Sequence, residues 1–291
     1  MSTTTSDFDV TEFKLYLYKP SLAAAVIFTI AFTAVSARHL QLLIQKRTWC
    51  FIPFLVGCLF EAVGYGGRAY SSSETPDWTL VPYMLQTMLI LLGPAFYAAS
   101  IYMVLGRLIR LLGGEEYSLV RLKWLTKLFL LGDILSILAQ GGGGGLLAGA
   151  SDESTQNLGN NVILLGLGIQ VVFFSGFMLV TATFHFRIWR RPTAKSRANG
   201  SPWNRFILVL YVVSVLILIR SLFRMVEYAQ GHDGSLVKKE VYVYTLDALL
   251  MLIVAVILAV SHPGDVLVQH KVLDSGVDFE HGSDAYGMAR R

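Results

Sequence analysis

Long uninterrupted blocks of apolar residues constrain this chain more than any other feature of its sequence. A helix rises 1.5 Å per residue, so about twenty apolar residues can cross a hydrocarbon core of roughly 30 Å. The length of the blocks favours membrane spans over the amphipathic helices of a soluble core. We predict seven spans, at about 20–43, 52–70, 82–109, 121–140, 162–189, 204–229 and 240–261.

The composition supports a membrane environment. Of 291 residues, 54% are hydrophobic and 15% charged, whereas about a quarter of a soluble protein is charged. The net charge of +4 comes from short loops beside the apolar blocks and forms no basic face interleaved with aromatic residues. We therefore expect membrane lipids as partners and no nucleic acid.

The basic residues also orient the spans. Lys and Arg gather in the loops after the first, third and fifth blocks and are absent from 71–81 and 141–160. Such basic loops remain in the cytoplasm, and only Lys238 and Lys239 in the sixth loop oppose this bias. We predict an all-α polytopic membrane protein, a seven-transmembrane helix bundle with its N-terminus outside and its C-terminus cytoplasmic. Its parts are an extracellular segment (1–19), the transmembrane domain (20–262) and a disordered cytoplasmic tail (263–291).

The glycine run and the two cysteines have simple interpretations. Gly141 to Gly145 leave the fourth block and suit an exit turn, since no Lys-Ser/Thr follows to make a phosphate-binding loop. Cys50 and Cys58 both lie at or within the second block, so they cannot join outer loops by a disulfide. We expect no disulfide framework.

Nothing in the sequence indicates a metal or a catalytic nucleophile. His39, His185 and His262 lie near the predicted cytoplasmic ends of spans, but no HxxxH or HExxH spacing occurs, which favours interfacial or capping roles. A GxSxG motif is also absent. We expect no catalytic residue, no metal and no cofactor. The sequon Asn199-Gly200-Ser201 falls on a predicted cytoplasmic loop and should remain unmodified.

Charged side chains inside the spans are the main functional signal. Each costs about 3 kcal/mol at the bilayer centre, so each must face a partner or a wet cavity. The charged residues are Glu61, Arg68, Asp133, Arg220, Arg224, Glu227 and Asp247, joined by the amides Gln86, Gln140 and Gln170.

These residues repeat at helical spacing, so each set forms one stripe. The stripes are Glu61-Tyr65-Arg68, Asp133-Ser136-Gln140 and Arg220-Arg224-Glu227. The span directions predict that the stripes converge on a polar pocket that leans toward the outer surface. Both a set of interhelical ion pairs and a ligand or translocation site fit this pattern.

Two further predictions concern the partners in this pocket. Arg220 and Arg224 are one turn apart and need acidic partners, for which Glu227, Asp247 and Asp133 are available at similar depth. Pro94 frees a backbone carbonyl in the third span and kinks it next to Tyr97, which either widens the pocket or serves only packing.

Several motifs taken together resemble a known family, the fungal RTA-like proteins or lipid-translocating exporter family, over roughly residues 20–265. The motifs are Glu61-x-x-Gly64-Tyr65-x-x-Arg68, Leu92-Gly93-Pro94 with Tyr97-Ala98-Ala99 and Ile101-Tyr102, Asp133 with Gln140 and its glycines, Arg220-x-x-Phe223-Arg224-x-x-Glu227-Tyr228, Glu240-x-x-x-Tyr244-x-x-Asp247, and His262-Pro263-Gly264.

The resemblance implies a seven-span fungal membrane protein. We expect it in the plasma membrane, with other endomembranes as the alternative. Family members are linked to export of sphingoid long-chain bases, aminosterol resistance, drug tolerance and, in one branch, porphyrin uptake. It implies a translocated amphiphile, whose amine Glu61 and Asp247 could hold while Arg220 and Arg224 gate or bind a headgroup. The candidate binding and translocation residues are Glu61, Tyr65, Arg68, Gln86, Tyr97, Asp133, Gln140, Gln170, Arg220, Arg224, Glu227, Tyr244 and Asp247.

Two other classes stay open at this point. A seven-span lipid-sensing receptor would share the topology and the pocket, although the third span lacks an acidic-Arg-Tyr triplet and the seventh lacks NPxxY. An intramembrane lipid-modifying enzyme could use Glu61, Asp133 or Asp247 as a general acid or base. Substrate, direction, energy source and oligomeric state are not indicated by the residues.

Overall fold

The protein is helical throughout the part of the chain that the structure describes. This computed structural model describes residues 20–74, 79–150, 152–198, 202–230 and 240–265, and no strand occurs among them. The predicted N-terminal segment (1–19), the tail beyond residue 265, the sequon and the pair Lys238–Lys239 lie outside these ranges.

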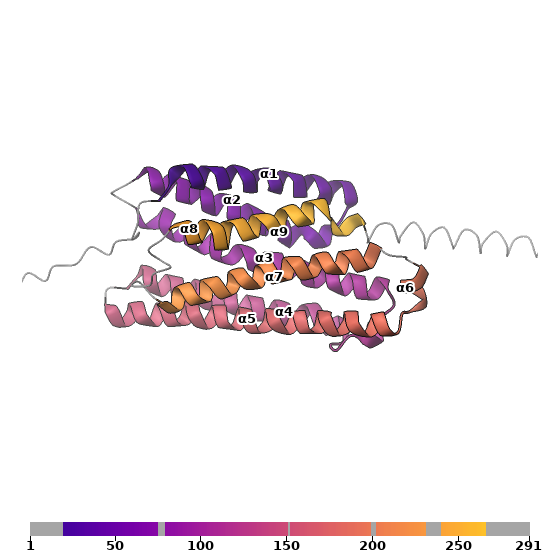
Figure 1. The fold of residues 1–291 in the computed structure, drawn as a ribbon. Coiled ribbons are helices and arrows are strands. Elements are labelled where there is room, and N and C mark those ends of the chain that lie inside the picture. Colours follow the sequence, from indigo (N-terminus) through magenta and orange to yellow (C-terminus); the bar gives the residue numbers. More distant parts are fainter. Residues whose placement is uncertain (1–19, 75–78, 151, 199–201, 231–239, 266–291) are drawn as a thin grey trace, which may run out of the picture.

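Seven long helical segments build the molecule (Figure 1). They are α1 (Leu22–Lys46), α2 (Ile52–Ser73), α3 (Leu80–Leu111), α4 (Leu122–Ala148), α5 (Glu153–Arg190), α7 (Pro202–Gln230), and a last segment made of α8 (Glu240–Tyr242), the π-helix η3 (Val243–Ala248) and α9 (Leu249–Val260). Short connecting elements are η1 (Trp49–Phe51), η2 (Glu115–Tyr117) and α6 (Ala194–Ala198).

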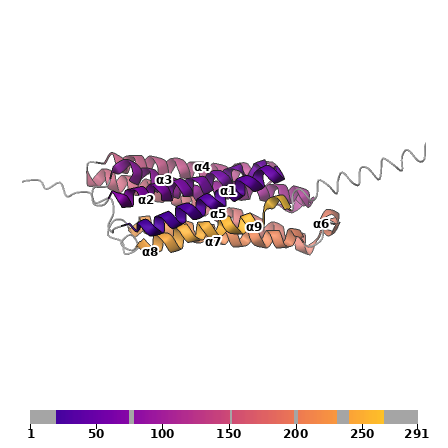
Figure 2. The ribbon, with the colours of Figure 1, turned by 90° about the horizontal axis from the view of Figure 1, so that it is seen from above.

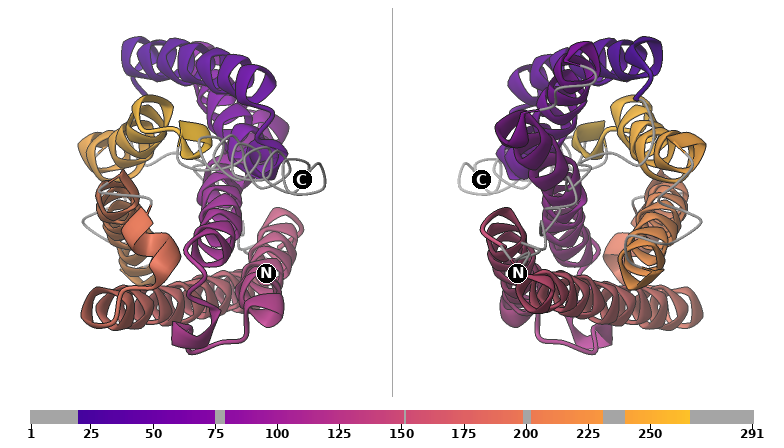
Figure 3. Two further views of the ribbon diagram at one scale, coloured as in Figure 1. Left: turned by 90° about the vertical axis from the view of Figure 1, so that its right-hand side faces the viewer. Right: turned by 90° about the vertical axis from the view of Figure 1, so that its left-hand side faces the viewer.

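The helices lie side by side along one long axis and close into a ring (Figures 2 and 3). Following the contacts around the ring, the order is α1, α2, α3, α4, α5, α7 and α9, and α9 returns to α1. Helix α3 also contacts α5 and α7. Side chains of α3 can therefore reach residues from both sides of the bundle.

Six of these segments are long and apolar enough to cross a membrane. They are Leu22–Lys46, Trp49–Ser73, Val81–Leu111, Glu153–Arg190, Trp203–Gln230 and Glu240–Asp265. This confirms an all-α polytopic membrane protein. Helix α4 is the seventh long helix, and its 27 residues extend for about 40 Å. Its place as a span and the orientation of the termini remain predictions.

The distribution of side chains also fits a lipid environment. Large apolar residues point outward along the helices; Ile27, Leu165 and Val172 are 64%, 63% and 69% exposed. Charged residues occupy the interior, and Arg220 is fully buried. A soluble protein has the reverse arrangement. The helices therefore turn apolar side chains outward and polar ones toward each other.

The predicted exit turn at Gly141 to Gly145 is wrong. Helix α4 continues through these glycines to Ala148, and α5 begins at Glu153, well before the predicted start at 162. The glycines allow close helix packing: a Cβ added to Gly143 would lie 2.7 Å from the carbonyl oxygen of Gly159. The run therefore serves the interface between α4 and α5.

The cysteine prediction is confirmed. Cys50 and Cys58 are both buried free thiols. Cys50 belongs to η1 and Cys58 to α2, and neither takes part in a disulfide.

Candidate functional site

The structure buries all of the predicted site residues and divides most of them among three clusters. We call these the Arg68 clamp, the central charge cluster and the α4–α5 polar cluster. Gln86 on α3 packs against Gly67 on α2, where an added Cβ would lie 3.3 Å from the Gln86 Cβ. The predicted site residues thus lie in separate groups of polar side chains, and their convergence on one pocket remains a prediction.

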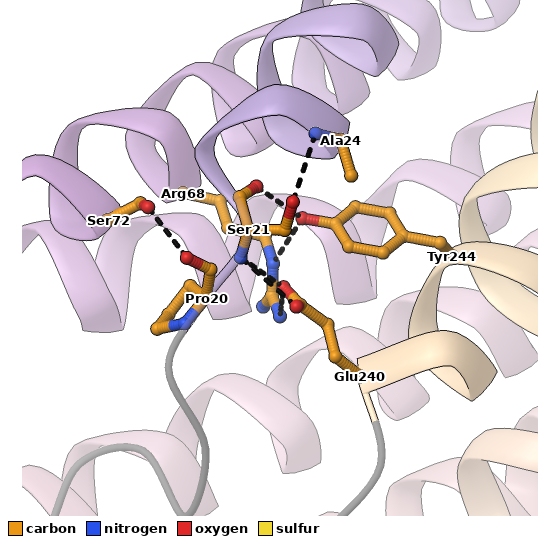
Figure 4. Close-up of polar contacts among 7 residues, drawn as sticks. All are labelled: Pro20, Ser21, Ala24, Arg68, Ser72, Glu240 and Tyr244. Atoms are coloured by element: carbon orange, nitrogen blue, oxygen red, sulfur yellow. Dashed lines mark hydrogen bonds and ion pairs between the residues drawn. The ribbon is translucent and has the colours of Figure 1, made fainter.

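The Arg68 clamp joins three helices at one end of the bundle (Figure 4). The Ser21 backbone N–H donates to both carboxylate oxygens of Glu240, at 2.9 and 3.0 Å. Arg68 donates from Nη2 to Glu240 Oε1 at 3.2 Å and from Nε to the Tyr244 hydroxyl at 3.1 Å. The start of α1 is thereby fastened to α2 and to the segment that precedes α9.

Glu240 is a partner that the sequence stripes did not include. It heads the series Glu240, Tyr244, Asp247, which has the same helical spacing as the other stripes, so that series was the available signal. Ser72 adds a second link, because its hydroxyl donates to the carbonyl oxygen of Pro20 at 2.8 Å. The clamp is therefore an interhelical fastening built from buried polar groups.

Arg220 lies at the centre of the second cluster. Its Nε donates to Asp247 Oδ1 at 2.5 Å, and its Nη2 donates to the backbone oxygen of Ile90 at 2.6 Å. In a regular helix the N–H four residues later would bond to that oxygen, but residue 94 is a proline and has no N–H. The carbonyl that Pro94 leaves free is therefore bound by Arg220.

Arg224 lies one turn further along α7 and has two acidic neighbours. Its Nη1 donates to Glu227 Oε2 at 2.7 Å and lies 3.9 Å from Asp247 Oδ2. Its guanidinium carbon lies 5.5 Å from the centre of the Tyr228 ring, a cation–π distance. Two of the three predicted acidic partners are thus present. The third, Asp133, pairs with neither arginine, because α5 lies between α4 and α7 in the ring.

Glu61 completes the central charge cluster and differs from its other carboxylates. Among the described residues it forms no ion pair, whereas Asp247 and Glu227 both do. It is 1% exposed, and its Oε1, like Oδ2 of Asp247, has no hydrogen-bond partner there. The charged groups close enough to interact electrostatically with the Glu61 carboxyl group are Asp247, Arg220 and Arg224. The cluster therefore contains three carboxylates, counting Glu227, against two guanidinium groups.

The backbone of α3 makes room for Glu61. A Cβ added to Gly93 would lie 2.7 Å from Glu61 Oε1, and one added to Gly57 would lie 2.8 Å from the Gly93 carbonyl oxygen. Tyr65 and Tyr97 border the same carboxylate, and Tyr97 stacks on Phe54 with ring centres 4.2 Å apart. Aromatic rings and glycine backbone thus enclose Glu61.

The α4–α5 polar cluster is separate from both. The Ser136 hydroxyl donates to the Gly166 carbonyl oxygen at 2.7 Å, and the Gln140 amide lies 2.5 Å from Ser136 Oγ and 3.3 Å from Gln170 Oε1. Asp133 is 1% exposed, and neither of its carboxylate oxygens has a hydrogen-bond partner within the described part of the chain. The phenol hydroxyl of Tyr102 on α3 is the side-chain group that interacts with the Asp133 carboxyl group.

The histidines have structural partners. His39 is fully buried rather than interfacial, and its Nε2 lies 2.9 Å from the Ala255 carbonyl oxygen on α9. His262 Nδ1 accepts from the Gly264 N–H at 3.1 Å, and His185 Nε2 lies 3.1 Å from Asn204 Oδ1. Within the described ranges, no three His, Cys, Asp or Glu side chains gather as a metal site would require.

A family model described as "RTA1 like protein" matches residues 54–270, a stretch that holds every charged residue of the three clusters. The chain belongs to the RTA1-like protein family. Protein RTA1 of Saccharomyces cerevisiae is 35% identical over 276 residues, which cover 86% of this chain and 85% of the relative. No solved structure matches the chain with significance.

Two RTA1-like relatives have names that state a cargo. Protoporphyrin uptake protein 1 of Saccharomyces cerevisiae is 34% identical over 296 residues, covering 90% of this chain and 94% of that protein. The sphingoid long-chain base transporter RSB1 of the same species is 28% identical over 277 residues, covering 84% and 72%. One name states the uptake of protoporphyrin and the other the transport of a sphingoid long-chain base.

Proposed function

We propose that this RTA1-like protein is a non-enzymatic transporter that translocates a cationic amphiphile of the sphingoid-base type across the plasma membrane. The observation that carries the proposal is Glu61, a buried carboxylate with an unpartnered oxygen inside a cluster of charges. Relatives named for sphingoid-base transport and porphyrin uptake support the same class of function.

The pairing in the central charge cluster assigns different roles to its acids. Asp247 is bound by Arg220 and Glu227 by Arg224, so neither is available to hold an amine without breaking an ion pair. Glu61 makes no such pair. A primary ammonium group has one positive charge and three hydrogen-bond donors. With it bound, the cluster would contain three positive and three negative charges. We therefore assign the amine to Glu61 rather than to both Glu61 and Asp247.

The surroundings of Glu61 suit the rest of such a substrate. The ring pairs Phe54–Tyr97 and Phe32–Tyr65 are each stacked face to face, and they give this part of the interior an apolar, aromatic character that suits a hydrocarbon chain. A headgroup hydroxyl could bond to the Tyr65 hydroxyl, which has no partner among the described residues, whereas the Tyr97 hydroxyl faces the Cys58 thiol. An amphiphile with an amine, hydroxyls and one long chain satisfies all of these groups.

The test is movement of fluorescent sphingoid-base and phosphatidylcholine probes across liposomes that contain purified protein. Glu61→Gln should reduce sphingoid-base movement at least tenfold, because it removes the charge and leaves the shape nearly unchanged. Glu116→Gln is the matched control, since Glu116 is exposed and outside the clusters. Folded wild-type protein that moves neither probe would contradict the proposal, and agonist-dependent binding of a cytoplasmic protein would then favour a receptor.

A further inference from the structure

We propose that Asp133 is a proton-binding site, separate from the central charge cluster, and that its protonation and deprotonation couple transport to a proton gradient. The inference rests on the transport function proposed above and adds its driving force. It follows from the surroundings of Asp133 on α4. Arginines pair with Glu240, Asp247 and Glu227, whereas Asp133 forms no ion pair among the described residues.

The first observation is that no cation compensates a negative charge on Asp133. This residue is 1% exposed, and the Tyr102 hydroxyl is the donor that faces its carboxyl group, without reaching the geometry of a full hydrogen bond. All ion pairs among the described residues involve other carboxylates, namely Asp265, Glu240, Glu115, Asp247 and Glu227. A buried carboxylate without a counter-charge costs several kcal/mol. Binding a proton removes that cost.

The neighbours of Asp133 do not supply another cation. From α3, Tyr102 acts on the carboxyl group, and within the described ranges no other titratable or charged group does so. From α5, Phe173 packs so closely against the neighbouring Gly132 that an added Cβ would lie 2.3 Å from its ring. Tyr102 itself is enclosed by Phe129, Phe174 and Phe177. The surroundings favour a neutral carboxylic acid.

A polar path leads from Asp133 toward the end of α4. Ser136 and Gln140 follow on the same helix face, and Gln140 joins Ser136 to Gln170. Beyond them on the same face, Gly143 and Gly144 pack against Gly159 and Met88, whereas Gly141, Gly142 and Gly145 have open space on the opposite face. In the proposed mechanism a proton reaches the Asp133 carboxylate along the Ser136 and Gln140 side chains when the contact between Gly143 and Gly159 opens. In each cycle one proton binds to a carboxylate oxygen and later leaves it, and no bond of another group changes.

The first experiment measures sphingoid-base movement in proteoliposomes with and without a pH gradient across the membrane. Wild-type protein should accumulate several-fold more probe with a gradient of one sign than without it, and Asp133→Asn should show no such difference. Asp152→Asn is the matched control, because Asp152 is an exposed acid and asparagine also caps helices. Asp133→Glu, which keeps the acid, should retain the gradient dependence and guards against a folding defect.

A second measurement does not depend on transport. The infrared spectrum of the wild-type protein in lipid should contain the carbonyl stretching band of a buried protonated carboxylic acid, and Asp133→Asn should lose it. An unchanged band in that variant, or a gradient effect that survives the substitution, would overturn the proposal. A response to a sodium gradient in place of a pH gradient would also overturn it. Wild-type protein that moves no probe but keeps the band would contradict only the transport function.

Discussion

Arg220 donates a hydrogen bond of 2.6 Å to the backbone oxygen of Ile90, the acceptor that Pro94 leaves unused in α3. The same guanidinium donates to Asp247, so one fully buried side chain of α7 joins α3 to the π-helix η3. A proline inside a helix normally costs stability because one carbonyl loses its partner. Here a side chain from another helix replaces that partner.

Replacing Arg220 should destabilise the fold strongly. In Arg220→Gln, Asp247 would be left as a buried charge without its main partner, and such changes cost about 3–5 kcal/mol. The free energy of unfolding, measured with denaturant in detergent micelles, should fall by that amount. The double variant Arg220→Gln with Asp247→Asn should recover part of the loss, since it removes the unpaired charge.

The exposed pair Arg110–Glu115 provides the control for this measurement. Its atoms lie 3.8 Å apart, and its side chains are 73% and 58% exposed. Arg110→Gln should therefore change the free energy of unfolding by no more than about 1 kcal/mol. Equal losses in the buried and exposed variants would contradict the role assigned to Arg220.

A methyl group at Gly93 should disturb Glu61. The added Cβ of Gly93→Ala would lie 2.7 Å from Glu61 Oε1, so the carboxylate must move, and sphingoid-base movement should fall several-fold in liposomes. Gly168→Ala is the matched control, because an added Cβ there meets no atom within 4 Å. If both variants transport equally well, the space beside Gly93 has no part in substrate binding.

Removing Glu240 should loosen the start of α1. Glu240→Ala removes the acceptor of the Ser21 N–H and the ion-pair partner of Arg68. Hydrogen exchange of the Ser21 amide should become at least tenfold faster, while amides in the middle of α1 should not change. Glu115→Ala serves as the control. Unchanged exchange at Ser21 would show that other contacts hold this end of the helix.

The first turn of α5 should weaken in acid. Hydrogen bonds from the side chain and backbone of Thr155 hold the pKa of the Asp152 carboxyl below its usual value. Because the folded pKa is depressed, this stabilisation is present above the pKa of a free aspartate, about 3.9, and is lost as the pH falls through the lower folded value. Exchange of the Thr155 amide, corrected for its intrinsic rate, should therefore rise below about pH 4. Asp152→Ala should abolish that dependence.

The predicted orientation can be tested with single cysteines. The native thiols Cys50 and Cys58 are 4% and 0% exposed and should not react with an impermeant reagent. Lys195→Cys, on the short helix α6, should react only from the cytoplasmic side, and Ser73→Cys at the end of α2 only from outside. The opposite pattern would mean that the bundle has the reverse orientation in the membrane. The C-terminal end of α4, where the proposed proton path ends, would then lie in the cytoplasm.

Patterns among residues close together in the sequence were sufficient to predict much of this structure. The apolar blocks indicated the helices because few other structures satisfy the backbone in lipid, and the intramembrane charges proved to be buried. Pro94 indicated a free carbonyl because its missing N–H is a local property of the chain. Each of these inferences uses only neighbours along the sequence.

The errors came from relations between helices. Spacing places Asp133 on a face of its helix, but it does not say that α5 separates α4 from Arg220 and Arg224. Glycines suggest a turn when considered alone, whereas Gly143 lies against Gly159 of the next helix. Glu240 was named within a family motif but left out of the candidate site, because its partners, Ser21 and Arg68, come from distant parts of the chain.

Tyr244 and Asp247 occupy the same short π-helix, and they connect two different clusters. Tyr244 accepts from Arg68 at the clamp, and Asp247 accepts from Arg220 at the centre. Tyr244 and Asp247 are three residues apart, so relaxing η3 to an α-helix would rotate one side chain relative to the other by roughly 50°. The two hydrogen bonds could not both keep their present geometry after that rotation, so η3 links the end of the bundle to its interior.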